Sequence, residues 1–352
     1  MIAAIQRAIE LKSTYNVRVI NLSLGRPVYE SYTLDPLCRA VEAAWKAGIV
    51  VVAAAGNNGR NTFTNGYATI NSPGNDPYVI TVGAMKTMST INRDDDQIAS
   101  YSSKGPTLID HVTKPDLVAP GNLLVSLLAS GSELANRYPG NILPATTPRY
   151  FRLSGTSMAA PMVSGAVALL LEAQPQLTPD QVKARLMKTA SKGFPLYSTA
   201  NDPTTGGTYV STYDLFTVGA GYLNIAAAFL NKDVSSKPAL SPKVQYDLLS
   251  RRVLLVNDPT TVWGSSAVWG TGAVWGTTVL VGDTAAVWGT AAVWGTDTTQ
   301  PFSAVWGTSA VWGTTAVWGT SAVWGSSAVW GTSAVWGTSA VWGTDTTGKG
   351  EN

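Results

Sequence analysis

The residues Ile49-Val-Val-Val-Ala-Ala54 form an uninterrupted apolar, β-branched run that ends just before Gly56. A run of this length and composition is typical of a strand covered on both faces, as in a parallel sheet. Val17–Leu22 is a short apolar run that ends at Ser23, and Val79–Gly83 is the next buried run after Ile49–Ala54. Asp35-Pro36 predicts the start of a helix that stops at Gly48, between Val17–Leu22 and Ile49–Ala54. Thr178-Pro-Asp-Gln181 is a capping box that opens a later helix. The sequence therefore predicts an α/β fold, a parallel sheet flanked by helices.

Composition divides the 352 residues into parts. Residues 1–232 have the mixture of a globular domain, 233–260 form a linker rich in Ser, Pro and Lys, 261–345 repeat a hexapeptide, and 346–352 are a tail. A net charge of +2, with 13% charged residues, gives no electrostatic reason to expect a nucleic-acid partner. No run of 18 apolar residues occurs, so we expect no membrane span.

The segment Ser154-Gly-Thr-Ser-Met-Ala-Ala-Pro161 leads into ten residues without a charge. We expect Pro161 in the first turn of a helix, where its missing N–H costs little. The lack of charges after it predicts a helix buried on all sides. Ser157 would then lie at a helix N-terminus, where developing negative charge is stabilised. The alternative is that these hydroxyl residues are only helix caps, which are common.

Gly155-Thr-Ser-Met-Ala-Ala-Pro161 resembles the active-site serine segment of the subtilisin-like serine proteases, the subtilases. Ala53-Ala-Ala-Gly-Asn-Asn-Gly59 is similar to the oxyanion loop of that family, although a turn after a strand would also explain it. The resemblance spans about residues 1–230. It implies a serine endopeptidase in which Ser157 is the nucleophile and Asn57 and the Ser157 N–H hold the oxyanion.

Asn21-Leu-Ser-Leu-Gly25 is similar to the family's substrate-binding strand, which pairs with an extended polypeptide substrate. By this resemblance, the substrate-binding residues are Ser23, Leu24, Gly25, Ala55 and Gly56. We expect no cofactor and no metal site. The family allows calcium, but no ligands can be assigned in this chain.

The catalytic Asp and His segments of the family, which precede the substrate strand, have no counterpart before Asn21. The single histidine is His111, next to Asp110, in a segment expected to be a surface loop. Loss of the histidine base costs about 10⁶ in kcat, a magnitude measured on a subtilisin. We therefore expect this chain to be nearly inactive by itself and to be part of a longer secreted protease. Without the strands of the missing part, Val17–Leu22 and Ile49–Ala54 would both lack a neighbour.

Twelve of the 13 tryptophans lie between Trp263 and Trp342, mostly six residues apart in Ala-Val-Trp-Gly-Thr units. Six is a multiple of the strand period, so equivalent residues would share one face, and a β-rich repeat stack is expected. The tryptophans would fill its core, or form an aromatic surface for cell wall or carbohydrate, or the repeat would be unstructured.

Two functions follow from these patterns. The first is a serine endopeptidase that acts through a Ser157 acyl-enzyme. The second is a non-catalytic structural or adhesion protein with a decayed protease domain. Residues 1–12 do not form a signal peptide, because Gln6, Arg7 and Glu10 interrupt the apolar residues. The repeat, by analogy, suggests an extracellular or cell-surface setting for the full-length parent.

Overall fold

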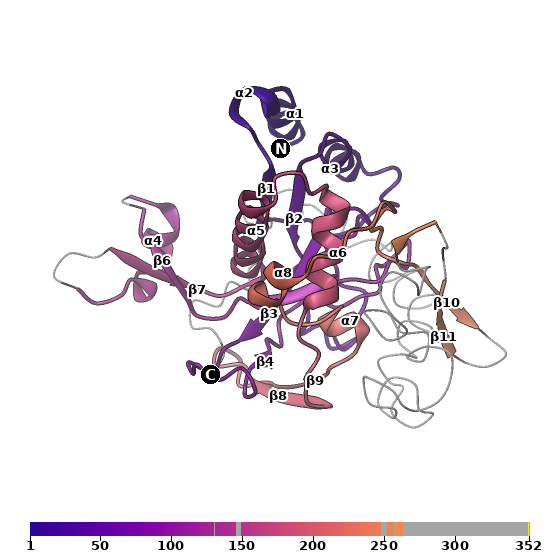
Figure 1. The fold of residues 1–352 in the computed structure, drawn as a ribbon. Helices are drawn as coiled ribbons and strands as arrows, with labels where there is room; N and C mark the ends of the chain where they lie inside the picture. Colours follow the sequence, from indigo (N-terminus) through magenta and orange to yellow (C-terminus); the bar gives the residue numbers. More distant parts are fainter. Residues whose placement is uncertain are drawn as a thin grey trace.

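The computed structural model describes residues 1–129, 131–145, 149–247, 252–256, 258, 260–262 and 351. At its centre lies a five-stranded sheet (Figure 1). Its strands are β1 (Val19–Leu22), β2 (Val50–Ala54), β3 (Ile80–Lys86), β4 (Gln97–Ile98) and β5 (Leu117–Pro120). The order is β1-β2-β3, with β5 parallel to β3 and the short β4 antiparallel to the end of β3. The predicted α/β class is confirmed.

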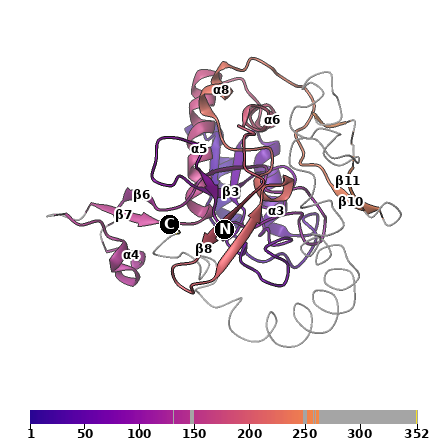
Figure 2. The same cartoon turned by 90° about the horizontal axis from the view of Figure 1, so that it is seen from below.

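The helices are α1 (Ile2–Glu10), α2 (Lys12–Tyr15), α3 (Pro36–Lys46), α4 (Glu133–Arg137), α5 (Thr156–Ala173), α6 (Pro179–Thr189), α7 (Leu215–Val218) and α8 (Ile225–Leu230), with a 3₁₀ turn at Pro139–Asn141. Three antiparallel two-stranded sheets complete the described fold: β6 (Leu124–Leu127) with β7 (Tyr150–Leu153), β8 (Tyr197–Asn201) with β9 (Thr208–Thr212), and β10 (Val244–Asp247) with β11 (Arg252–Leu255). Figures 1 and 2 both show β6, β7 and α4 projecting away from the central sheet.

Local signals placed these elements correctly. All five residues of β2 are buried, and since alternate side chains point to opposite faces, both faces of this strand are covered. Asp35 caps α3 by accepting a hydrogen bond from the Leu37 N–H, with Pro36 at the first helical position. The capping box of α6 is complete, because the side chains of Thr178 and Gln181 each bond to the backbone of the other residue.

The expectation that the helix after Ser157 is buried on all sides is wrong. Helix α5 packs along β1, β2, β3 and β5, but one stripe of it is exposed, with Met162 at 41% and Leu169 at 47%. Pro161, Gly165 and Ala168 lie on the same stripe. The sheet covers only one side of the helix, and no described residue covers the other. By length and composition α5 could also cross a membrane, but its packing on four strands is that of a core helix.

The expectation of two strands without a neighbour is half wrong. Strand β2 lies between β1 and β3, with Val52 in register with Ile80, so it has a partner on each side. Strand β1 pairs only with β2 among the described residues, and three of its four residues are partly or fully exposed. Of these two strands, therefore, only β1 has an open edge in the described part of the fold, and the Ser164 Oγ of α5 bonds to its Asn21 side chain at 2.9 Å.

The described part of the predicted linker, 233–260, packs on the domain. Ser241 is buried and its hydroxyl donates to Asp116 at 2.5 Å, and the Ala239 N–H donates to Asp180 at 2.8 Å. The short apolar run at its end forms β11. The predicted β-rich repeat lies outside the described residues, apart from its first two positions.

Candidate active site

The chain enters α5 through a turn that only glycine adopts easily. Gly155 has φ +150° and caps the helix, and its N–H donates to the Gly121 carbonyl at 2.8 Å. The hydroxyl of the preceding Ser154 accepts from the Leu123 N–H at 2.8 Å. These two bonds fix the first turn of α5 against the segment that follows β5, and they set the position of Ser157 two residues later.

Ser157 occupies the second position of this 18-residue helix and is half-buried. Its hydroxyl donates to the backbone carbonyl of Ser23 at 3.0 Å, just beyond the end of β1. Its own N–H donates to none of the described residues, as is usual in the first turn of a helix. The helix dipole and this open N–H both favour a negative charge that forms beside Ser157.

Asn57 follows the carboxyl end of β2, and its side-chain amide is held by Thr156. The Asn57 Oδ1 accepts from the Thr156 N–H at 2.9 Å and from the Thr156 hydroxyl at 3.1 Å. The same hydroxyl accepts from the Gly56 N–H at 3.1 Å. With its oxygen fixed, the amide presents Nδ2, which donates to no residue in the described ranges. A Cβ at Gly155 would lie 3.3 Å from that Nδ2, so glycine keeps the space before it open.

Of the predicted substrate residues, Ser23 bonds directly to Ser157. Arg26 pairs with Ser72 through two backbone bonds of 2.9 and 2.8 Å, which hold the chain extended. The backbone groups of Leu24 and Gly25, by contrast, bond to nothing within the described ranges, so an added strand could pair there. Ala55 and Gly56 differ, because their backbone groups bond to Val82, Asn71, Ser103 and Thr156. Their role in binding substrate stays a prediction.

The expectation that Pro161 lies in the first turn is wrong, since α5 begins at Thr156 and Pro161 lies inside it. Proline has no N–H, so the carbonyl four residues earlier, that of Ser157, loses its helical partner. The Ser23 hydroxyl takes this place and donates to the Ser157 carbonyl at 2.6 Å. Ser23 and Ser157 thus exchange two hydrogen bonds, one through each hydroxyl, and Ser23 holds the helix where proline has removed a bond.

This exchange predicts a coupling between Ser23 and Pro161. Ser23→Ala should lower the free energy of unfolding by about 1–3 kcal/mol, because the Ser157 carbonyl is left without its donor. In a Pro161→Ala background the N–H at position 161 can donate to the Ser157 carbonyl. Ser23→Ala should then lower the free energy of unfolding by about 1 kcal/mol less than it does in the parent. Urea unfolding of the two single variants and the double variant measures the coupling. Strictly additive losses would show that the hydroxyl does not replace the missing helical bond.

His111 lies elsewhere in the fold. It is in the loop that enters the amino end of β5, whereas Ser23 and Asn57 follow the carboxyl ends of strands parallel to it. The Asp110 carboxylate accepts from the Ser31 hydroxyl at 2.6 Å and from the Tyr32 N–H at 2.9 Å, so it is engaged there. Burial lowers the pKa of His111, opposed by Asp110 and assisted by Lys243. The His111 N–H donates to the Thr107 carbonyl at 3.1 Å, and the His111 carbonyl accepts from the Val244 N–H at 2.9 Å.

Sequence reasoning missed Thr156 and the hydroxyl role of Ser23. Thr156 stands inside the Gly-Thr-Ser motif, which was the available signal for it. The bond from the Ser23 hydroxyl depends on a contact across 134 residues of sequence, which no local pattern indicates. In the described ranges, no group of three or more His, Cys, Asp or Glu side chains is placed to hold a metal ion.

The Ser157 hydroxyl, the Ser157 N–H and the Asn57 amide bound to Thr156 thus lie at the first turn of α5. A profile of the subtilase family of S8 peptidases matches residues 1–221, and the chain belongs to this family of serine endopeptidases. Serine protease AprX of Bacillus subtilis (strain 168) is 43% identical over 178 residues, which are 50% of this chain and 38% of AprX. Subtilisin DY of Bacillus licheniformis is 36% identical over 226 residues, 64% of this chain and 62% of that protein.

Among solved structures, fervidolysin from Fervidobacterium pennivorans matches with a TM-score of 0.46 and 25% identity. The match covers 67% of this chain and 29% of fervidolysin. The chain spans less than two thirds of the length of AprX and of subtilisin DY.

Proposed function

We propose that residues 1–232 supply the nucleophile and the oxyanion donors of a serine endopeptidase, and that the general base comes from residues outside these 352. The observation that carries the proposal is the pair of open donors beside the Ser157 hydroxyl, the Asn57 Nδ2 and the Ser157 N–H. A polypeptide would add as a strand along Leu24 and Gly25, which places its scissile carbonyl near Ser157.

In this reaction the Ser157 Oγ leaves its bond to the Ser23 carbonyl and attacks the carbonyl carbon of the substrate. A base takes the hydroxyl proton, and the oxyanion accepts hydrogen bonds from Asn57 and the Ser157 N–H. The base then returns the proton to the leaving amine, which gives an acyl-Ser157 that water hydrolyses. This chain holds the parts that bind and stabilise, while His111, its one imidazole, lies on a different loop. The polypeptide alone would therefore be nearly inactive, and the complete enzyme would act outside the cell.

Labelling with a fluorophosphonate tests Ser157 as the nucleophile. With excess imidazole as an added base, the chain should be labelled at one site. Ser157→Ala should abolish the labelling, because no hydroxyl remains beside the two donors. Ser164→Ala, on the same helix and also half-buried, is the matched control and should be labelled like the parent. Labelling that persists in Ser157→Ala, or is absent from all three proteins, would favour the non-catalytic structural or adhesion function.

A further inference from the structure

Glu351, next to the last residue, is inserted into the protease domain far from the active-site serine in sequence. Its side chain is fully buried, although it stands at the end of the chain. The Arg60 guanidinium contacts one carboxylate oxygen at 2.5 Å, and the Lys86 ammonium lies 3.6 Å from the other. The Ser100 N–H donates to the carboxylate at 3.0 Å, and the Ser100 hydroxyl donates to it as well.

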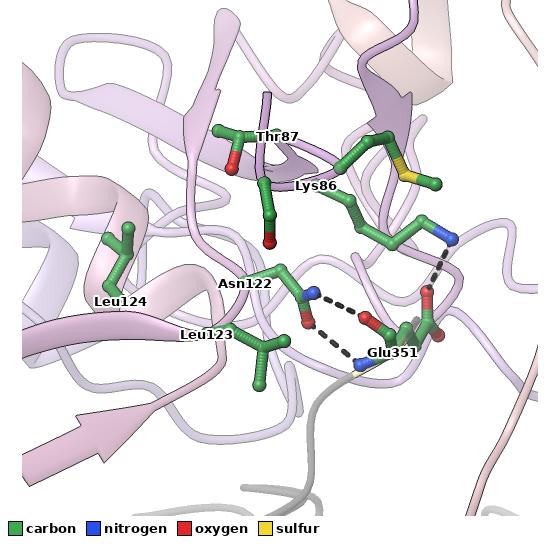
Figure 3. A pocket seen from close by; sticks show the side chains of 8 residues that line it. Lys86, Thr87, Asn122, Leu123, Leu124 and Glu351 are labelled. Carbon is green, nitrogen blue, oxygen red and sulfur yellow. Dashed lines mark hydrogen bonds and ion pairs between the residues drawn. The ribbon is translucent and has the colours of Figure 1, made fainter. Parts of the chain in front are cut away.

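Asn122 binds the backbone of the same residue. Its Nδ2 donates to the Glu351 carbonyl at 2.7 Å, and its Oδ1 accepts from the Glu351 N–H at 3.0 Å (Figure 3). A neighbouring strand would bond to an extended peptide in the same way, through the N–H and C=O of one residue. Arg60, Lys86 and Ser100 thus bind the side chain of Glu351. Asn122 binds its backbone.

The charges show that the site is built for an anion. Lys86 is 1% exposed, and its burial lowers its pKa, which the Glu351 carboxylate opposes. Arg60 also pairs with Asp202 at 2.8 Å and donates to the Ser100 hydroxyl at 2.8 Å, so its orientation is fixed without the tail. The Glu351 carboxylate contacts both the buried Lys86 and the largely buried Arg60, and removing this negative charge from a site of low polarity is costly.

The site adjoins the entrance to α5. Asn122 follows Gly121, whose carbonyl accepts from the Gly155 N–H, and precedes Leu123, whose N–H donates to the Ser154 hydroxyl. Leu123 has φ +55°, a conformation that costs free energy for a leucine. A cavity of about 260 Å³, lined in part by Thr87, Leu124 and Glu351, opens beside the tail. A peptide could approach the site from this side.

We propose that Arg60, Lys86, Ser100 and Asn122 form a binding site for an extended peptide with a glutamate side chain, and that the C-terminal tail of this chain occupies it. This proposal does not depend on the catalytic function of Ser157.

A peptide of residues 346–352, labelled at its N-terminus, tests the site in the full chain by fluorescence anisotropy. Glu351→Lys should drive the tail out by repulsion from Arg60 and Lys86, so this variant should bind the peptide. The parent should bind it at least about tenfold more weakly, because its own tail competes at high effective concentration. Glu10→Lys, the same change at an exposed glutamate, should behave like the parent. A peptide with Gln at position 351 should lose at least about tenfold in affinity for Glu351→Lys.

Equal binding by the parent and Glu351→Lys would overturn the proposal, as would equal binding of the Glu and Gln peptides or no binding to a folded Glu351→Lys protein.

Hydrogen exchange in the unaltered chain gives a second test that needs no charge reversal. The Glu351 amide should exchange at least about tenfold more slowly than in Asn122→Ala, because Asn122 accepts its N–H. An amide that exchanges equally fast in both proteins would show that the tail is not held.

Discussion

Asn57→Leu should lower the rate at which Ser157 is acylated by about 10²–10³-fold, a magnitude that comes from a subtilisin. Leucine is close to asparagine in size but offers no N–H to the oxyanion, so one of the two donors is lost. The loss should appear in the second-order rate constant for a fluorophosphonate at a fixed imidazole concentration. The unfolding midpoint should fall as well, because the Thr156 N–H and hydroxyl lose the Asn57 Oδ1 as their acceptor, so the rate is measured well below that midpoint.

Asn58→Leu is the matched control for this prediction. Asn58 is the exposed neighbour of Asn57, and its side chain makes a long, 3.4 Å bond to Asn71. Its replacement should leave the labelling rate within about threefold of the parent, because it contacts neither Ser157 nor Thr156. If the two variants lose equally, or if Asn57→Leu loses less than the control, Asn57 does not stabilise the oxyanion.

Asp116→Asn should lower the free energy of unfolding by about 3–5 kcal/mol. The Asp116 carboxylate is fully buried between two buried ammonium groups, with Lys114 at 2.7 Å and Lys183 at 3.3 Å. Lys183 already has a pKa lowered to about 7, chiefly by burial and against the attraction of Asp116. A neutral asparagine leaves both ammonium groups without their counter-charge. Urea unfolding followed by far-UV circular dichroism measures the loss.

Asp233→Asn makes the same chemical change at an exposed ion pair. Asp233 pairs with Lys188 at the surface, where its side chain is 44% exposed, and its loss should cost less than about 1 kcal/mol. Similar losses in the two variants would mean that the buried cluster contributes no more than a surface pair.

The elements that the sequence predicted correctly are those specified by adjacent residues. Asp35-Pro36, the Thr178–Gln181 capping box and the apolar run of β2 each carry their own structural signal within a few positions. The serine motif likewise placed Ser157 at the start of a helix. The first turn of this helix was misplaced because proline is common in first turns. Here Pro161 lies further inside the helix, and the hydroxyl of Ser23, just after β1, compensates for its missing N–H.

Other features depend on contacts that no local pattern contains. The charge-free residues after Pro161 suggested complete burial, but burial depends on which elements surround a helix, and the described part of the fold covers only one side of α5. The residues around Asp116 gave no signal of its buried ion pairs, since Lys183 and Ser241 reach Asp116 from distant positions. Glu351 carried no sequence signal, because a single glutamate near a chain end is ordinarily solvated.

The most direct test of a nucleophile without its own base is the dependence of Ser157 labelling on added imidazole. A polypeptide of these 352 residues should be labelled very slowly in buffer alone, and the rate should rise in proportion to neutral imidazole. His111→Gln should leave both rates unchanged. A fast rate that does not depend on imidazole, and that falls in His111→Gln, would contradict the account by showing that the chain contains its own general base.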